Sequence, residues 1–296
     1  MQTIQQKETH KYFTSHAQDW QNKANTSNEK IVNIIIQRNG YVIDVIKDRS
    51  ETKSLFDIGC GTGDLVCDVA SQGINATGVD FVQDMIEIAK NKAKDKQLEN
   101  AHFECSSIFD FDFSKQKFDI ISANGFIEYI SQNELNKFFD IVNDALTPGG
   151  SFVVGSRNRL YNLFSLNSFT LQELNESNAD ALLREATALA SGKTIEEVSK
   201  MKTASLQRDD TKHAKTGIDV STRFQYTPLQ LINMLNNRGL KASEIYPIHI
   251  HSTPSIFKDK QLEIHTSISN LLQTYGRHCK ELVPFSSYFM LHVEKR

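Results

Sequence analysis

Gly59, Gly61 and Gly63 alternate between a short apolar run, Leu55 to Ile58, and the start of a helical pattern. This arrangement predicts a strand, a tight loop and a helix N-terminus. Glycine lets the backbone turn sharply and lets a ligand lie against it without a Cβ in the way. The helix start adds N–H groups that have no partner within the helix. The segment therefore predicts an α/β fold that binds a nucleotide-like ligand.

Acidic residues around this loop argue against a dinucleotide. The dinucleotide fingerprint has its third glycine where this chain has Asp64. A carboxylate at a helix N-terminus repels a pyrophosphate, and Asp57 adds a second negative charge. Asp80 ends the next expected strand, residues 74–79, about 20 residues past the loop, where an acid can accept hydrogen bonds from ribose hydroxyls or cap the following helix. The pattern favours a cationic ligand that contains a ribose.

Three further segments of the chain carry recognisable patterns. Residues 117–126 predict a fourth strand, and residues 146–152 read Leu-Thr-Pro-Gly-Gly-Ser-Phe, a helix stop before a fifth strand. Residues 12–20 hold an aromatic cluster near the N-terminus. Together with the glycine loop and Asp80, these segments resemble the class I S-adenosylmethionine-dependent methyltransferases. The likeness is greatest to their small-molecule branch around the ubiquinone-type O-methyltransferases.

The resemblance implies a doubly wound, seven-stranded, mostly parallel sheet of Rossmann-like type. An N-terminal helical cap is expected at residues 1–50 and the cofactor-binding core at 51–156. A helical insertion that forms a substrate lid is expected at 157–226, and the rest of the core sheet at 227–296. The aromatic segment at 12–20 either folds over the cofactor as a lid or anchors a surface helix in the core.

Local patterns predict several of the remaining elements. A helix is expected over residues 31–46 with an interruption at Gly40. Thr194 and Thr227 each begin a capping box, the second with proline at the first helical position. The remaining strands are expected at residues 102–105, 244–250 and 288–294.

The resemblance also implies the cofactor, S-adenosylmethionine, with S-adenosylhomocysteine as the product. It places Asn124 and Gly125 near the methionine end, Asp80 at the ribose and Phe81 against the adenine. Ser107 stands where relatives often carry an acid that binds the adenine amino group. The full set of expected cofactor contacts is Asp57, Gly59, Cys60, Gly61, Gly63, Asp80, Phe81, Ser107, Ile108, Asn124, Gly125, Tyr12 and Trp20.

Substrate contacts are expected after the fifth strand. Arg157 and Asn158 leave the strand at the edge that faces the ligand crevice of open α/β sheets. The arginines at 157 and 159 either clamp an anionic group on the substrate or pair with surface acids. Tyr129 occupies the position where relatives often carry a histidine after Glu128. We include Tyr129 with Arg157 and Asn158 as expected substrate contacts.

Three histidines are candidates for a general base. His249 and His251 lie at the end of the sixth expected strand, so strand alternation puts both on one face. A base of near-neutral pKa assists an alcohol or phenol nucleophile, and His251 is preferred. His16 in the aromatic segment is the third candidate. The alternative is one structural and one solvent-facing histidine. The His-x-His pattern also begins some metal sites, but no third ligand is evident, so no metal is predicted.

Composition bears on where the protein is located and which kinds of partner it binds. The net charge is −3, and the four cysteines show no metal-type spacing. We expect reduced thiols, a cytoplasmic location, no membrane span and no general attraction to nucleic acid.

The hypothesis is methyl transfer from S-adenosylmethionine to a small-molecule acceptor, with oxygen favoured over nitrogen. The alternatives are an rRNA or tRNA methyltransferase, a cofactor-binding regulatory protein without catalysis, and a NAD-binding dehydrogenase. The acceptor and the oligomeric state stay open.

Overall fold

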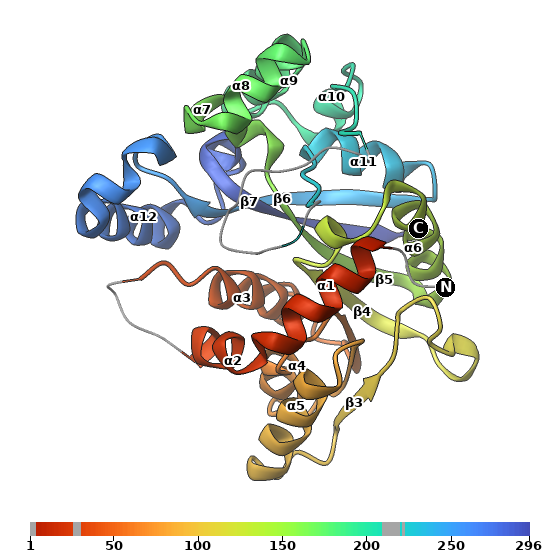
Figure 1. Cartoon of the computed structure of the whole chain (residues 1–296). Helices are drawn as coiled ribbons and strands as arrows, with labels where there is room; N and C mark the ends of the chain where they lie inside the picture. Colours follow the sequence, from red (N-terminus) through yellow and green to blue (C-terminus); the bar gives the residue numbers. More distant parts are fainter. Residues whose placement is uncertain (1–3, 26–30, 209–219, 221–222) are drawn as a thin grey trace.

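The computed structural model describes residues 4–25, 31–208, 220 and 223–296 (Figure 1). Strands form the centre of this part of the chain. Their bounds are β1 Ser54–Ile58, β2 Asn75–Asp80, β3 Ala101–Cys105, β4 Phe118–Asn124, β5 Leu146–Arg157, β6 Leu240–Ile250 and β7 Ser286–Lys295.

The strands form a seven-stranded sheet in the order β3-β2-β1-β4-β5-β7-β6. β7 runs antiparallel to both of its neighbours, β5 and β6. The pairings among β3, β2, β1, β4 and β5 are parallel. The expected doubly wound, mostly parallel sheet is thereby confirmed. The carboxyl ends of β1, β2 and β4 meet at one edge, where a ligand crevice is expected.

Helices follow most of the strands. The α-helices are α1 Ile4–Ser15, α2 Ala17–Asn25, α3 Ile34–Lys47, α4 Asp64–Ala70, α5 Gln83–Asp95, α6 Gln132–Ala145, α7 Asn162–Ser165, α8 Ser168–Asn175, α9 Ala179–Ala190, α10 Ile195–Ser199, α11 Pro228–Asn236 and α12 Leu262–Gly276. The short 3-10 helices are η1 Phe113–Lys115, η2 Ile127–Tyr129, η3 Arg159–Tyr161, η4 Ser255–Gln261 and η5 Lys280–Phe285. Within the described ranges, every helix is too short or too polar to span a bilayer.

Alternating side chains on the central strands build two apolar layers. In β1, Leu55 packs with α3 and α4 on one face, and Phe56 packs with α6 on the other. In β4, Ile120 and Ile121 divide in the same way. Successive strand residues point to opposite faces, so both faces of a sheet covered by helices must be apolar. This burial fixes the register of the strands that carry the loops at the carboxyl-end edge.

Two helix starts agree with their sequence signals, and α3 differs from its expectation. The capping boxes at Thr194 and Thr227 are present at the starts of α10 and α11. The expected interruption at Gly40 is wrong, because α3 runs unbroken through it. A glycine inside a helix costs about 1 kcal/mol relative to alanine. The buried face of α3, which includes Tyr41 and Val42, offsets this cost.

Residues 157–208 form η3 and α7 to α10. Figure 1 shows α7, α8 and α9 (green) grouped at the top of the view, with α10 beside α11. A buried ion pair joins η3 to α8 within this group. Arg159 donates from Nε and Nη2 to the two carboxylate oxygens of Glu173, each at 2.8 Å. At the other end of the chain, α1 contacts α5 and η2, which brings it to the carboxyl-end edge of the sheet.

Candidate functional site

A cavity of about 820 Å³ lies at the carboxyl ends of β1, β2 and β4. The glycine loop after β1, the segment after β3 and the turn after β4 form one part of its wall. Residues of α1, α2 and α3 form the opposite part, with Phe13 from α1 and Trp20 from α2. This volume lies within the range of small-molecule and cofactor pockets, and its place is where open α/β sheets bind ligands.

Most of the expected cofactor residues meet on this wall. Two of them, Gly63 and Tyr12, do not line it. A Cβ on Gly63 would lie 2.6 Å from Phe103 Cε1 and 2.7 Å from Ala89 Cβ, so this glycine serves close packing between α4, β3 and α5. Tyr12 is buried and stacks on His16. The expected residues that line the cavity are Asp57, Gly59, Cys60, Gly61, Asp80, Phe81, Ser107, Ile108, Asn124, Gly125 and Trp20, together with the expected substrate residue Tyr129.

Asp80 is held by two backbone hydrogen bonds. The N–H of Gly61 donates to Asp80 Oδ2 and the N–H of Val82 donates to Oδ1, both at 3.0 Å. The second bond supports the start of α5, and the first ties the glycine loop to β2. Each carboxylate oxygen has a further lone pair for a ligand. Asp80 therefore supports the helix start and faces the cavity at the same time.

The two acids flanking the glycine loop have different environments. Asp64 forms an ion pair with Lys92, with 2.6 Å between Oδ1 and Nζ, and accepts from Thr62 Oγ1 at 2.7 Å. Its charge is balanced, so it contributes less to ligand choice than the sequence suggested. Asp57 is 4% exposed and accepts a hydrogen bond from Ser122 Oγ at 2.6 Å. Burial, with a smaller effect of Asp80, raises the pKa of Asp57 to about 7, although Ser122 and Arg38 oppose this rise.

The ligand-free protein should lose stability as the pH rises from about 4 to about 7. In the folded chain Asp57 keeps its proton up to about pH 7, whereas the unfolded chain releases it near the ordinary value of 3.8. Between these values deprotonation favours unfolding by up to about 1.36 kcal/mol per pH unit. Thermal melting across this interval measures the effect. Asp57→Asn should make the melting temperature depend less steeply on pH over this interval. The control Asp95→Asn, at the exposed end of α5, should leave that dependence unchanged. Equal slopes of melting temperature against pH in the two variants would contradict this explanation.

Arg38 on α3 is a site residue that the sequence analysis missed. It is 9% exposed and lines the cavity. A Cβ at Gly125 would collide with Arg38 Nη1, so the absence of a side chain at Gly125 makes room for the guanidinium. Among the described residues, Arg38 Nε and Asn124 Oδ1 are buried without a hydrogen-bond partner. A signal did exist, because Arg38 falls on the apolar face of its helix with Tyr41 and Val42.

A second group of polar side chains forms the wall near Tyr129. Glu128 and Arg223 form a buried ion pair, and Arg223 Nη2 donates to Tyr288 Oη at 2.6 Å. The guanidinium of Arg223 lies 5.4 Å from the ring centroid of Tyr129. All four residues line the cavity. Arg223 and Tyr288 were not expected here, since each lies far from η2 in the sequence.

The three candidate base histidines do not line this cavity. His16 stacks on Tyr12, and its Nδ1 lies 2.8 Å from the carbonyl oxygen of Tyr12. His249 and His251 stack on each other with ring centroids 4.1 Å apart, so they share one side of the chain as alternation predicts. Burial lowers the pKa of His251 to about 3 and that of His249 well below its ordinary value. Both imidazoles are therefore neutral at physiological pH.

The expected substrate residues Arg157 and Asn158 also do not line the cavity. The guanidinium of Arg157 lies 5.6 Å from the ring centroid of Phe169. Its pKa is lowered, first by burial and then by Arg223. Asn158 donates to the carbonyl oxygens of Val283 at 2.6 Å and Ser286 at 2.9 Å. Asn158 therefore joins the end of β5 to the start of β7.

Residues 49–223 match the protein family described as a methyltransferase domain. A ubiquinone biosynthesis O-methyltransferase of Coxiella burnetii is 30% identical over 153 residues, which cover 51% of this chain and 62% of that protein. Uncharacterized protein RP028 of Rickettsia prowazekii is 33% identical over 102 residues, 34% of this chain and 41% of that protein. The chain thus spans about two fifths to three fifths of the length of these relatives.

Solved structures share the fold over nearly the whole chain. Magnesium protoporphyrin IX methyltransferase from Synechocystis PCC 6803 with bound SAH has a TM-score of 0.55 and 13% identity, covering 97% of this chain and 98% of that one. The [4+2]-cyclase SpnF has a TM-score of 0.56 and 15% identity, covering 99% and 96%. At these identities the likeness shows the fold alone.

Proposed function

Because this chain belongs to the class I S-adenosylmethionine-dependent methyltransferases, we propose that it transfers a methyl group from that cofactor to a small-molecule acceptor. The observation that carries this proposal is one cavity that joins the glycine loop and Asp80 to the polar wall around Tyr129. The first part suits a donor that contains a ribose and an ammonium group. The second part lies in the same space and suits an acceptor.

Several cavity residues can form further hydrogen bonds, ion pairs or apolar contacts with the donor, S-adenosylmethionine. Asp80 has lone pairs for the ribose hydroxyls, and Phe81 and Ile108 offer apolar surface to the adenine. The amino-acid end of the donor carries an ammonium and a carboxylate. Asp57 suits the ammonium, because a cation restores the ionised form that burial disfavours. Arg38 suits the carboxylate, because its buried Nε lacks a partner among the described residues.

The bound sulfonium activates its methyl group for displacement, and the chain supplies alignment. Holding the two reactants in line converts a bimolecular step into an effectively unimolecular one. We infer that α1 and α2 cover the cavity and exclude water from it, since Thr9, Phe13 and Trp20 line it. No histidine lines the cavity in the described part of the chain, so this proposal rests on positioning and not on a histidine base.

We propose oxygen as the acceptor atom. The Coxiella burnetii relative named for O-methylation supports this choice. The polar wall around Tyr129 suits an aromatic alcohol as the acceptor. Phe13, Tyr129 and Tyr288 offer ring surfaces there, and the Glu128–Arg223 pair offers polar groups. A bulky hydrophobic tail on the acceptor would have to leave the cavity, whose volume of about 820 Å³ must also hold the donor.

The test measures S-adenosylhomocysteine formation with matched acceptors. A catechol or phenol series is compared with amines of the same ring and with bulk tRNA. We expect turnover with the phenols, little with the amines, and none with tRNA. Tight binding of S-adenosylhomocysteine with no turnover on any acceptor would favour a regulatory protein. Turnover on tRNA alone would favour the nucleic-acid alternative.

A further inference from the structure

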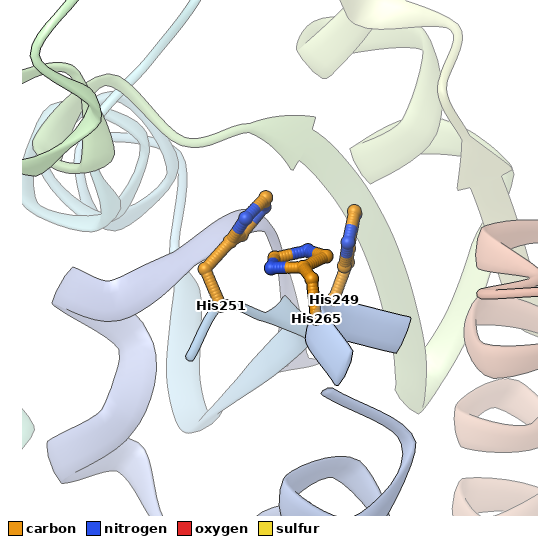
Figure 2. Close-up of side chains that lie close together, drawn as sticks. All are labelled: His249, His251 and His265. Atoms are coloured by element: carbon orange, nitrogen blue, oxygen red, sulfur yellow. The ribbon is translucent and has the colours of Figure 1, made fainter. Parts of the chain in front are cut away.

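Three imidazoles meet at the end of β6, outside the cavity (Figure 2). His265 comes from α12, and its ring centroid lies 5.0 Å from that of His251 and 5.9 Å from that of His249. One ring nitrogen of each residue lies within 4.8 Å of the others. His249 is 5% exposed and His265 is 2% exposed. The third ligand that the sequence did not reveal is thus present on a later helix.

Several of these ring nitrogens lack partners. Within the described residues, His249 Nε2 and both ring nitrogens of His251 are buried without a hydrogen bond. A buried polar atom without a hydrogen-bond partner destabilises the folded state, so three such atoms in one cluster require an explanation. A metal ion shared by the three rings would satisfy one nitrogen on each of them.

Hydroxyl groups surround the cluster where they can orient metal ligands. Ser287 Oγ lies 3.1 Å from His249 Nδ1. With the proton on Nδ1 donated to Ser287, Nε2 keeps its lone pair for a metal. Around His265, Ser252 Oγ lies 3.4 Å from Nδ1 and Ser269 Oγ lies 3.4 Å from Nε2. Either nitrogen of His265 can therefore bind a metal while a serine holds the other.

The backbone at His249 adds an independent observation. His249 has a φ of 54°, a left-handed conformation, and its N–H donates to Gln37 Oε1 at 2.8 Å. Residues other than glycine adopt this region uncommonly, and strained residues cluster at functional sites. The strain falls at the end of β6, where the rings of His249 and His251 stack.

We propose that His249, His251 and His265 bind one divalent transition-metal ion, and that Zn²⁺ fits the site best. Zinc binds imidazole nitrogens at about 2.0–2.1 Å, and sites with three protein ligands leave a fourth position for water. Magnesium and calcium prefer carboxylate and carbonyl oxygens, whereas the three ligand atoms of this cluster are imidazole nitrogens. Ligand nitrogens around tetrahedral zinc lie about 3.4 Å apart. The rings must therefore turn inward from their separation of up to 4.8 Å.

The ion would join the end of β6 to α12. None of the three histidines lines the cavity, so the metal stabilises this part of the fold and takes no part in methyl transfer. This role also explains why two histidines at a strand end, which the sequence suggested as bases, lie away from the donor site.

The test is titration of the full chain, stripped with a chelator, with Zn²⁺ and with Co²⁺. We expect one equivalent of zinc to bind and the melting temperature to rise by several degrees at excess zinc. Cobalt should give the visible absorption of a tetrahedral site. His265→Gln and His249→Asn should each weaken zinc binding at least 100-fold, and asparagine tolerates the left-handed backbone at position 249.

Matched controls separate this site from other zinc ligands. His102→Gln, on an exposed histidine of β3, should leave the affinity unchanged. Cys105→Ser and Cys279→Ser remove two exposed thiols, because cysteine thiolates are also zinc ligands. The absence of stoichiometric binding would overturn the proposal. So would equal affinity in His265→Gln, or a thiolate-to-cobalt charge-transfer band. These readouts do not depend on methyl transfer, so they remain informative if the proposed activity is absent.

Discussion

Replacing Gly61 with arginine should weaken the binding of S-adenosylmethionine and S-adenosylhomocysteine at least 100-fold. Gly61 lines the cavity, and a Cβ added to it would meet no atom within 4 Å. Because Gly61 lines the cavity, we expect the new side chain to occupy the space that we assign to the ribose. Its guanidinium would also pair with Asp80, whose Oδ2 lies 3.0 Å from the Gly61 nitrogen. A loss of 100-fold corresponds to about 2.7 kcal/mol of binding free energy.

Gly149→Arg is the matched control for this variant. Gly149 has a φ of 73° against 52° for Gly61, and a Cβ at either position meets no atom within 4 Å. Both substitutions therefore carry a similar strain at positive φ, which is of order 1–2 kcal/mol. Gly149 lies on the surface at the start of β5, so its variant should bind the cofactor normally. Calorimetric titration with S-adenosylhomocysteine measures both. Unchanged affinity in Gly61→Arg would refute the assignment of the loop.

The cofactor side of the site follows from short segments of sequence. The glycine loop, Asp80 and the turn at Asn124 each end a buried strand, and parallel strands bring their carboxyl ends to one edge. Order along the chain then places these residues in one cavity. Local capping signals likewise fix helix starts, because the hydrogen bonds they describe join residues three positions apart.

The remaining site residues depend on contacts between distant segments. The partner of Asp64 is Lys92 on another helix, and the partner of Glu128 is Arg223, 95 residues further along the chain. No periodicity in the sequence encodes such pairs. Strand alternation did place His249 and His251 on one side of the chain. It carried no information on whether that side faces the cavity, and it did not reveal His265.

The fold itself leaves the reaction open. A [4+2]-cyclase shares it over most of the chain at 15% identity, so the activity has to be argued from the side chains of the site. Here those side chains form two groups. The donor part, with Asp80 and Arg38, has polar groups ready for a charged cofactor. The part that we assign to the acceptor includes Arg223, which lies near the end of the expected insertion. We therefore expect changes in the insertion to alter acceptor choice before donor binding.

Replacing Arg159 with methionine should lower the free energy of unfolding by about 3–5 kcal/mol. Arg159 is fully buried and donates from Nε and Nη2 to Glu173 at 2.8 Å each. Its Nη1 also donates to the carbonyl oxygen of Ser205. Methionine fills much of the volume but leaves the Glu173 carboxylate buried. Among the described residues, one side-chain donor to it then remains, Asn162 Nδ2 at 2.9 Å. Urea unfolding measures the change.

Two further variants identify the cause of that loss. Arg184→Met breaks an exposed pair with Asp180 on α9 and should cost at most about 1 kcal/mol. Arg159→Met combined with Glu173→Leu removes both buried charges, and the double variant should recover much of the stability lost in the single one. If it stays as unstable as Arg159→Met alone, lost packing and not an unpaired charge explains the effect. If Arg159→Met costs no more than Arg184→Met, the buried pair between η3 and α8 does not stabilise the insertion.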